Sequence, residues 1–499
     1  MKGVNKKIII ASIIIFIVSF GIRLWDITGL GITADEATWI IRGNHYIDSI
    51  LEGKFVQASS AKFGAHPGIT TAILIGVSEK LFKNSLGELT AARLPLILIN
   101  SLTPLLLLWF LARLSKFKTG VFAATILALD PFHISLSRIA HLDALLTFFI
   151  TATLLTYFLA EKEKKESLKI LAGVFFGLAL LTKLLAVSVL IIIFTYKILT
   201  SIKKKRINIS LFDFYGLFAG FLVFYIFFTK IWTHPLSGFI EHIKNNLQGE
   251  LAAGHINFFL GEITSAPSKL FYLVVLPIRL PEITLVFFVI GLLFALYKLH
   301  QKNLNIFLII WLLIILILLS TQSKMGDRYA IPAWPAISVI AAYGLIKIPC
   351  FLKNKNLRFI LTLALIFAGS IFYIIQYSPN YYFFYNSLVG GAEGAKRFVV
   401  VGRGEGHREL VEYFKDKNAK IGFLGDNRLV EFYDTSGKFE RLSAEFRPEK
   451  YDFIAVYTSA KQRLKPNLAV AKYLKDKTPI DTIHLNNVKV FEIYPHTKF

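Results

Sequence analysis

Long apolar runs, separated by short polar stretches, fill the first 380 residues of the chain. Most runs contain about 17–22 residues with almost no charge, the length that a helix needs to cross roughly 30 Å of hydrocarbon. Because many such runs follow one another, a removable signal peptide cannot account for them. The pattern predicts a mainly α fold, a polytopic transmembrane helical bundle. The eleven predicted spans are residues 8–27, 94–112, 120–136, 144–160, 168–181, 184–199, 211–232, 283–297, 304–320, 330–346 and 360–377.

The basic residues predict how the spans are oriented. Lys2, Lys6 and Lys7 precede the first run, so the positive-inside rule places the N-terminus in the cytoplasm. A further apolar stretch, Gly68 to Phe82, is ambiguous, because the basic linker 113–118 would lie outside if this stretch crossed the membrane. If the stretch instead lies on the outer surface or dips into it, every later basic linker falls inside. We therefore expect the second arrangement, in a multi-pass protein of the plasma (cell) membrane.

The composition changes near Ser378, where the apolar runs end. Segment 398–404 predicts a strand that runs into a turn. Segments 420–424, 452–457 and 488–494 predict strands, and segments 407–417 and 467–476 predict helices. Alternating strands and helices indicate a small α/β domain. The predicted organisation is a membrane domain at residues 1–380 with external loops 28–92 and 233–282, followed by an external soluble α/β domain at residues 381–499.

Composition and charge support the membrane interpretation and exclude some alternatives. Hydrophobic residues make up 55% of the chain, above the roughly 45–50% of soluble domains. The net charge is +23, from 56 Lys and Arg against 33 Asp and Glu. The basic clusters lie between apolar runs, where membrane orientation explains them, so we expect no nucleic-acid partner. A single cysteine, Cys350, excludes an internal disulfide and a Cys-based metal cluster.

An acidic pair, Asp35 and Glu36, follows the first predicted span and would lie outside. One explanation is structural, because acidic residues are favoured at a helix N-terminus. The other is catalytic, since a positioned carboxylate can accept the proton of an attacking hydroxyl. A charge at the edge of the bilayer is costly, which favours a function for it.

Two further polar segments are expected on the same side. His66 precedes a Pro-Gly pair and could donate a hydrogen bond to a phosphate or sugar, although proline at a helix start is also a structural feature. The short segment 130–143 contains Arg138, His141 and Asp143. A hydrated loop would explain it, but Asp143 falls at the membrane boundary. Arg138 could pair with Asp143 or with a ligand phosphate.

Several cations are also predicted on the outer face. Lys183 separates two apolar runs, either as part of a tight turn or as a point charge facing a lipid phosphate. Lys324, Arg328 and Tyr329 end a later outward span and could form an anion cradle or an interfacial anchor. Taken together, the acids would serve an acceptor hydroxyl and the cations would neutralise a phosphate leaving group.

These segments resemble the membrane glycosyltransferases of the GT-C fold, specifically the protein mannosyltransferase and aminoarabinose transferase group (glycosyltransferase family 39 and relatives). The resemblance covers about residues 1–380. It implies a polyprenyl- or dolichyl-phosphate-linked monosaccharide donor, inverting transfer on the outer side of the membrane, and a protein, lipid or glycan acceptor. It makes Asp35 and Asp143 the two loop acids, with Glu36 as a neighbour, and gives phosphate contacts to Lys183, Lys324 and Arg328. The matching stretches are 34–37, 66–68, 92–95, 131–143, 181–183 and 324–332.

The sequence also has to be weighed against three other functions. An oligosaccharyltransferase should carry a Trp-Trp-Asp type signature in its soluble domain, and the segment after residue 380 has no tryptophan. A transporter or lipid flippase places ionisable groups near the bilayer midplane, whereas here they gather at one edge. A non-catalytic scaffold would not need acids and cations on the same face. No cofactor is required; a divalent metal is allowed, but Asp35, Glu36 and His66 lack a defined ligand spacing.

Overall fold

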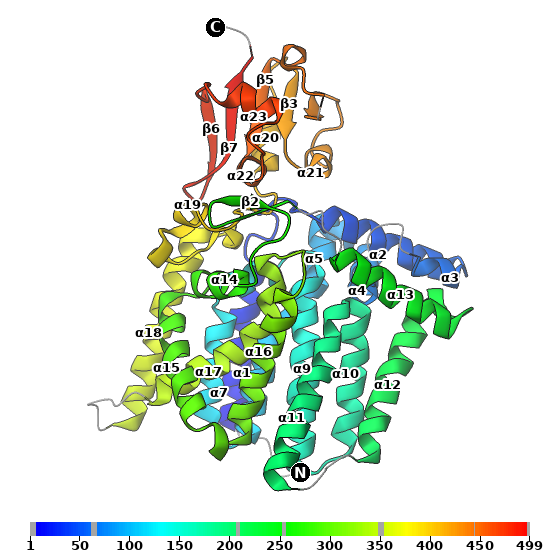
Figure 1. The fold of residues 1–499 in the computed structure, drawn as a ribbon, viewed down its shortest axis with the longest axis vertical. Helices are drawn as coiled ribbons and strands as arrows, with labels where there is room; N and C mark the ends of the chain where they lie inside the picture. The colour runs from blue at the N-terminus through cyan, green and yellow to red at the C-terminus, as the bar shows by residue number, and fades with distance from the viewer. Residues whose placement is uncertain are drawn as a thin grey trace.

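Helices dominate the part of the chain that the computed structural model describes, namely residues 6–60, 67–205, 210–251, 256–347, 354–443 and 445–496. Figure 1 shows long helices lying side by side, with a small sheet domain beyond one end of the bundle. The predicted fold class, a mainly α membrane bundle with a small C-terminal α/β domain, is confirmed. The domain boundaries drawn at residues 380 and 381 stay a prediction.

Seven helices of the described residues are long and apolar enough to cross a membrane. A bent helix pair is an eighth candidate, and three shorter apolar helices complete the set, so each predicted run contains a helix. The seven are α1 (Lys6–Leu24), α5 (Glu88–Asn100) with α6 (Thr103–Arg113), α9 (Leu142–Glu163), η1 (Leu184–Val187) with α11 (Ser188–Lys204), α16 (Asn303–Ser320), η4 (Asp327–Ala333) with α17 (Trp334–Lys347), and α18 (Lys355–Tyr377). The shorter helices are α10 (Ser167–Thr182), α12 (Leu211–Phe227) and α15 (Glu282–Tyr297).

The predicted span 120–136 is not one straight helix. It is divided between α7 (Phe117–Ala128) and α8 (Pro131–Ser137), which meet at 64°. Pro131 has no amide hydrogen and starts a new helix, and the Asp130 side chain caps that helix by accepting a hydrogen bond from the His133 amide at 2.7 Å. The bend leads the chain into the segment 138–143, which contacts the loop after α1.

Glycines bring neighbouring spans into backbone contact. A Cβ atom on Gly173 of α10 would lie 1.9 Å from the carbonyl oxygen of Gly216 on α12. The same holds between α15 and α17, where a Cβ on Gly291 would lie 1.9 Å from the Ile340 carbonyl oxygen. Small residues allow such close approach and favour packing between helices in lipid. The contact fixes α10, whose last residue, Thr182, directly precedes Lys183.

Short helices cover the end of the bundle nearest the C-terminal domain. Figure 1 shows α2 (Glu36–Leu51), α3 (Phe55–Ala58) and α13 (Pro235–Leu251) lying across this end. The predicted surface stretch 68–82 is α4 (Ile69–Leu86), which packs on α2 and is not among the helices whose length and hydropathy fit a span. The loop 233–282 also contains a hairpin of β1 (Asn257–Phe259) and β2 (Glu262–Thr264), and α14 (Phe271–Arg279).

The C-terminal domain is built on a five-stranded sheet with the order β4-β3-β5-β7-β6. β3 runs parallel to β4 and β5, and β7 runs antiparallel to β5 and β6. The strands are β3 (Ile421–Leu424), β4 (Phe439–Arg441), β5 (Phe453–Tyr457), β6 (Asp481–Leu485) and β7 (Val488–Pro495); the helices are α19 (Gly391–Ala395), α20 (His407–Phe414), α21 (Asn427–Glu431), α22 (Thr458–Gln462) and α23 (Ala469–Leu474).

The sequence predicted β3, β5, β7, α20 and α23. In segment 398–404, predicted as a strand that runs into a turn, the strand is wrong and the turn is present. In that segment only Val399 makes an isolated bridge, to Phe259. The reason lies in Gly402, Gly404 and Gly406, whose φ angles of 92°, 103° and 95° are incompatible with a regular strand. The segment 402–406 forms the turn, here called the glycine turn.

The C-terminal domain is bound to the loop between α1 and α2. Arg408 donates hydrogen bonds to the carbonyl oxygens of Thr28 and Gly29 at 3.1 and 2.8 Å. The Ile32 amide donates to the Tyr433 hydroxyl at 2.7 Å. These contacts hold residues 28–34, the loop that leads into α2.

Candidate functional site

Asp35 lies at the turn that begins α2. Its backbone has φ 73° and ψ −17°, in the left-handed region that aspartate adopts more readily than most residues. The Asp35 carbonyl accepts a hydrogen bond from the Trp39 amide at 3.1 Å, and the preceding Ala34 amide donates to the Arg403 carbonyl at 2.8 Å. The Asp35 side chain is 37% exposed, so its carboxylate can be reached from outside the protein.

Glu36 points the other way and is fully buried. Its two oxygens accept hydrogen bonds from Arg93 Nε at 2.9 Å and Arg93 Nη2 at 2.7 Å. They also accept hydrogen bonds from the amide and hydroxyl of Thr33, both at 2.8 Å, and from the Ala140 amide at 2.7 Å. With this many donors the Glu36 carboxylate has no free position for a substrate, and it ties the Asp35 loop to α5 and to the segment before α9.

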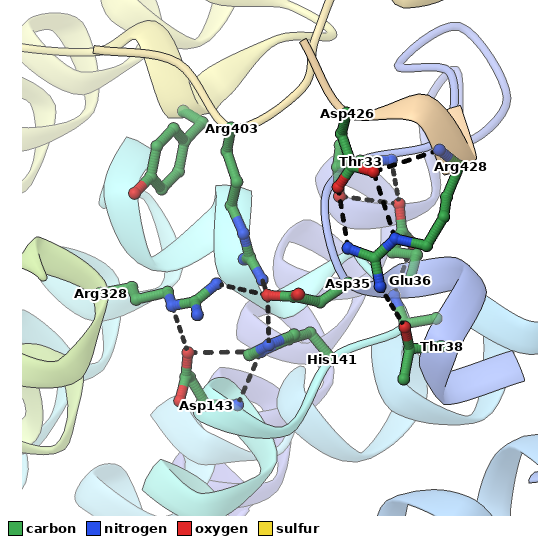
Figure 2. A network of polar contacts seen from close by, with 12 residues as sticks. Thr33, Asp35, Glu36, Thr38, His141, Asp143, Arg328, Arg403, Asp426 and Arg428 are labelled. Atoms are coloured by element: carbon green, nitrogen blue, oxygen red, sulfur yellow. Dashed lines mark hydrogen bonds and ion pairs between the residues drawn. The ribbon is translucent and has the colours of Figure 1, made fainter. Parts of the chain in front are cut away.

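Asp35 and Asp143 lie on either side of Arg328, as Figure 2 shows. Arg328 Nη1 is 3.0 Å from Asp35 Oδ2, and Arg328 Nε is 3.5 Å from Asp143 Oδ2. His141 links the same two acids, with Nε2 3.7 Å from Asp35 and Nδ1 3.3 Å from Asp143. The fold thus brings the predicted acids, a predicted cation and a predicted histidine into one cluster.

Lys183 extends this cluster. It directly follows α10, and its Nζ atom is 3.3 Å from Asp143 Oδ1. The same ammonium lies over the Tyr329 ring, 4.1 Å from its centroid, and both side chains are buried. Asp143 therefore pairs with two cations, Lys183 and Arg328.

Asp327 anchors η4 and so positions Arg328. Buried Arg279 donates to Asp327 Oδ2 from Nε at 3.0 Å and also from Nη2. The Tyr382 hydroxyl donates to Asp327 Oδ1 at 2.6 Å, and the Arg328 amide donates to the same oxygen at 2.7 Å. The sequence did not single out Arg279, although a lone arginine next to an apolar helix is the kind of signal that could have found it.

Arg403 enters the cluster from the glycine turn of the C-terminal domain and was not predicted. Figure 2 shows its side chain reaching toward Asp35, with Nη2 3.7 Å from Asp35 Oδ2. A sequence pattern could not place it here, because Asp35 and Arg403 lie at opposite ends of the chain.

Of the two partners predicted for Arg138, Asp143 or a ligand phosphate, the pairing with Asp143 is wrong. The buried guanidinium instead donates to the carbonyls of Trp25, Asp26 and Pro379 at 2.6, 2.7 and 3.2 Å. Lys324 is partly exposed and makes no ion pair or hydrogen bond to a described residue. His66 lies outside the described residues.

The electrostatics keep Asp35 ionised. Burial acts to raise its pKa, but the hydrogen bond from His141 and the positive charges of Arg328 and Arg403 outweigh burial, so the pKa of Asp35 lies below its usual value. Burial and the charge of Arg403 lower the pKa of His141, against the opposite effect of the acids beside it. The His141 ring is therefore neutral near pH 7. Its Nδ1 lies 3.4 Å from the Asp143 amide and 3.3 Å from the Asp143 carboxylate, and its Nε2 lies 3.7 Å from the Asp35 carboxylate.

The acidic side chains of this cluster are already engaged by protein groups. No group of three His, Cys, Asp or Glu side chains within the described ranges is arranged to hold a metal ion. Glu36 has both oxygens engaged by Arg93, Thr33 and Ala140, and guanidinium groups stand beside the Asp35 carboxylate.

His407 holds the glycine turn and should make the stability of the domain depend on pH. Its Nδ1 donates to the Gly404 carbonyl at 2.8 Å, and its Nε2 accepts from the Asp426 amide at 3.3 Å. Burial lowers the pKa of His407 from 6.5 to about 4. Below pH 6.5 the His407 ring binds a proton in the unfolded chain but stays neutral in the folded protein. The free energy of unfolding should therefore decrease as the pH is lowered from 6.5 to about 4, by up to about 3 kcal/mol.

Thermal unfolding of the purified protein measured across this pH range tests the expectation. The His407→Gln protein retains a donor and an acceptor but does not titrate, so its unfolding temperature should fall less steeply with acid. Parallel pH profiles for the two proteins would show that His407 does not contribute.

The chain was compared with protein families and with solved structures. Residues 65–232 match a family model described as dolichyl-phosphate-mannose-protein mannosyltransferase. The fold is similar to that of ArnT from Cupriavidus metallidurans bound to undecaprenyl phosphate, with a TM-score of 0.54 and 12% identity over 98% of this chain and 97% of that one. The apo form of the same protein gives a TM-score of 0.55 at the same identity and coverage.

A second similar structure is the archaeal oligosaccharyltransferase AglB from Archaeoglobus fulgidus, in complex with an inhibitory peptide and a dolichol-phosphate. Its TM-score is 0.52 and its identity 13%, over 91% of this chain and 69% of that one. No curated protein matches the chain by sequence. The chain therefore has the fold of these structures, the GT-C fold, and its residues 65–232 carry the match to the mannosyltransferase family model.

Proposed function

We propose that this protein transfers a monosaccharide from a polyprenyl-phosphate-linked donor to an acceptor hydroxyl. The observation that carries the proposal is the cluster itself. The partly exposed carboxylate of Asp35 pairs with Arg328, and Asp143 joins Arg328 to a second cation, Lys183. An accessible base next to buried positive charge suits a reaction in which a hydroxyl loses a proton and a phosphate leaves.

The proposed chemistry assigns one step to each side. Asp35 accepts the proton of the acceptor hydroxyl as its oxygen forms a bond to the anomeric carbon. The bond between that carbon and the donor phosphate breaks on the opposite face of the sugar, which inverts the anomeric configuration. Lys183 and Arg328 stabilise the negative charge that the phosphate gains, and Asp143 keeps both cations in place. Glu36 positions the loop of the base.

Two of the similar structures support a lipid-linked donor. The ArnT structure holds undecaprenyl phosphate, and the AglB structure holds a dolichol-phosphate. The matched family is described by a dolichyl-phosphate-linked mannose donor and a protein acceptor. A polyprenyl- or dolichyl-phosphate sugar in the membrane is thus the proposed donor, and a protein, lipid or glycan hydroxyl the proposed acceptor.

The test is transfer by purified full-length protein in lipid nanodiscs. The protein is supplied with a panel of polyprenyl-phosphate monosaccharides and with one lipid-linked oligosaccharide, together with candidate acceptors, and the products are identified by mass spectrometry. Transfer from a monosaccharide donor supports the proposal. Transfer only from the oligosaccharide would make the protein an oligosaccharyltransferase. If no sugar is transferred from either donor class, the assignment is overturned.

The site is proposed to face the outside of the cell, because the basic linkers assign the opposite face to the cytoplasm. The C-terminal domain packs on the loop that carries Asp35, so both must lie on the same side of the membrane. We expect a reporter fused after Phe499 to be active only outside. A cytoplasmic signal would place the whole site on the inner face.

A further inference from the structure

We propose that Arg403 of the C-terminal domain is a direct ligand of the donor phosphate, so that the active site is assembled from both domains. This inference rests on the function proposed above and extends it to a residue outside the membrane bundle. The ligand chemistry is a phosphate mono- or diester, carried by the lipid donor before transfer and by the polyprenyl phosphate product after it.

The first observation is that the Arg403 guanidinium is buried without hydrogen bonds. Only 5% of its side chain is exposed, and Nε, Nη1 and Nη2 have no acceptor among the described residues. Buried arginine donors are costly to leave unpaired, and the cost is removed when a ligand supplies acceptors. The buried arginines nearby, Arg93 and Arg279, by contrast donate to carboxylates and carbonyls.

The second observation is the charge balance of the cluster. Arg328, Lys183 and Arg403 carry three positive charges, and Asp35 and Asp143 carry two negative charges. Asp35 alone faces two guanidinium groups, with Arg328 at 3.0 Å and Arg403 at 3.7 Å. A phosphodiester with one negative charge would balance the charges joined by these ion pairs and could accept the unpaired donors of Arg403.

The third observation is that the glycine turn fixes where Arg403 points. The backbone amide of Arg403 donates to Glu405 at 2.6 Å, and the Gly404 amide donates to the Tyr457 hydroxyl at 2.9 Å. A Cβ atom on Gly404 would lie 3.0 Å from the Ala34 amide nitrogen, so the turn lies directly against the Asp35 loop. Figure 2 shows the side chain descending from this turn to the carboxylate.

The hydrogen bond from His141 and the charges of Arg328 and Arg403 together lower the pKa of Asp35, so the carboxylate is a poor proton acceptor in this arrangement. A phosphate that draws the Arg403 guanidinium toward itself would weaken that effect. Asp35 would then become more basic when the donor is bound, and a hydroxyl would be activated only in the presence of a sugar to attack.

The experiment measures binding of undecaprenyl phosphate to the full-length protein in nanodiscs, with undecaprenol as the lipid without phosphate and inorganic phosphate as the headgroup without lipid. We expect the Arg403→Ala protein to bind undecaprenyl phosphate about ten- to a hundredfold more weakly, the effect of removing one charged hydrogen-bonding group. The Arg403→Lys protein should recover part of the affinity. Binding of undecaprenol should not change in either.

The matched control is Arg441→Ala, which removes an exposed arginine from β4 of the same domain. It should bind undecaprenyl phosphate like the unchanged protein, and the unfolding temperature of every variant is measured alongside. Wild-type affinity in Arg403→Ala would overturn the inference, as would an equal loss of undecaprenol binding, which indicates a structural role. If the unchanged protein does not distinguish undecaprenyl phosphate from undecaprenol, the proposed function itself fails. Competition by inorganic phosphate would show that the headgroup suffices.

Discussion

The Asp35→Asn protein should bind the lipid-phosphate donor and fail to transfer its sugar. An asparagine preserves the shape of the side chain but cannot accept the proton of the attacking hydroxyl, so kcat should fall by about 10²- to 10⁴-fold. Donor affinity should stay the same or increase, because Arg328 and Arg403 lose the carboxylate that competes with the phosphate. The measurements are turnover with the active donor and equilibrium binding of undecaprenyl phosphate.

Asp26→Asn is the matched control for this prediction. Asp26 lies in the same loop, is exposed, and makes no side-chain ion pair in the described residues. Its replacement should leave turnover close to normal. Near-normal turnover in Asp35→Asn would remove Asp35 as the base, whereas a loss of both turnover and donor binding would indicate that Asp35 mainly arranges the cations.

Replacing Glu36 should destabilise the protein more than any other single change at the site. In Glu36→Gln the buried Arg93 loses its ionic partner. The new side chain has one acceptor oxygen instead of two, so some of the hydrogen bonds from Arg93, Thr33 and Ala140 are lost. Breaking a buried ion pair by removing one partner costs about 3–5 kcal/mol. We expect a lower unfolding temperature and the loss of transfer, because the Asp35 loop is no longer held.

A double-mutant comparison separates the pair from its surroundings. Arg93→Met removes the cation, and the double variant Glu36→Gln with Arg93→Met leaves no buried charge behind. The double variant should be less destabilised than the sum of the two single variants. Strict additivity would mean that Glu36 stabilises the loop through Thr33 and Ala140 rather than through Arg93.

The sequence predicted the membrane bundle well, because a span needs a long apolar run and every such run is visible in the chain. It also selected Asp35, Asp143, Lys183 and Arg328, since charges at the edge of a bilayer are rare and stand out. The fold brings these four together. Their catalytic roles stay predictions.

What the sequence could not predict depends on tertiary contacts. Arg138 binds backbone carbonyls of Trp25 and Asp26 rather than Asp143, and carbonyl positions follow from the path of the chain, not from residue type. β4 was missed because three residues give no periodic signal. Arg403 was missed because only the docking of the glycine turn brings it to Asp35.

The hydrogen bond between the Ala34 amide and the Arg403 carbonyl joins a residue made early in synthesis to one made late. About 370 residues separate them, so at a synthesis rate of about 5–20 residues per second the partner arrives on the order of half a minute later. Until then the loop between α1 and α2 lacks its contacts with Arg403, Arg408 and Tyr433. A nascent chain therefore carries its acid but not the arrangement around it, and the finished site belongs to the full-length protein alone.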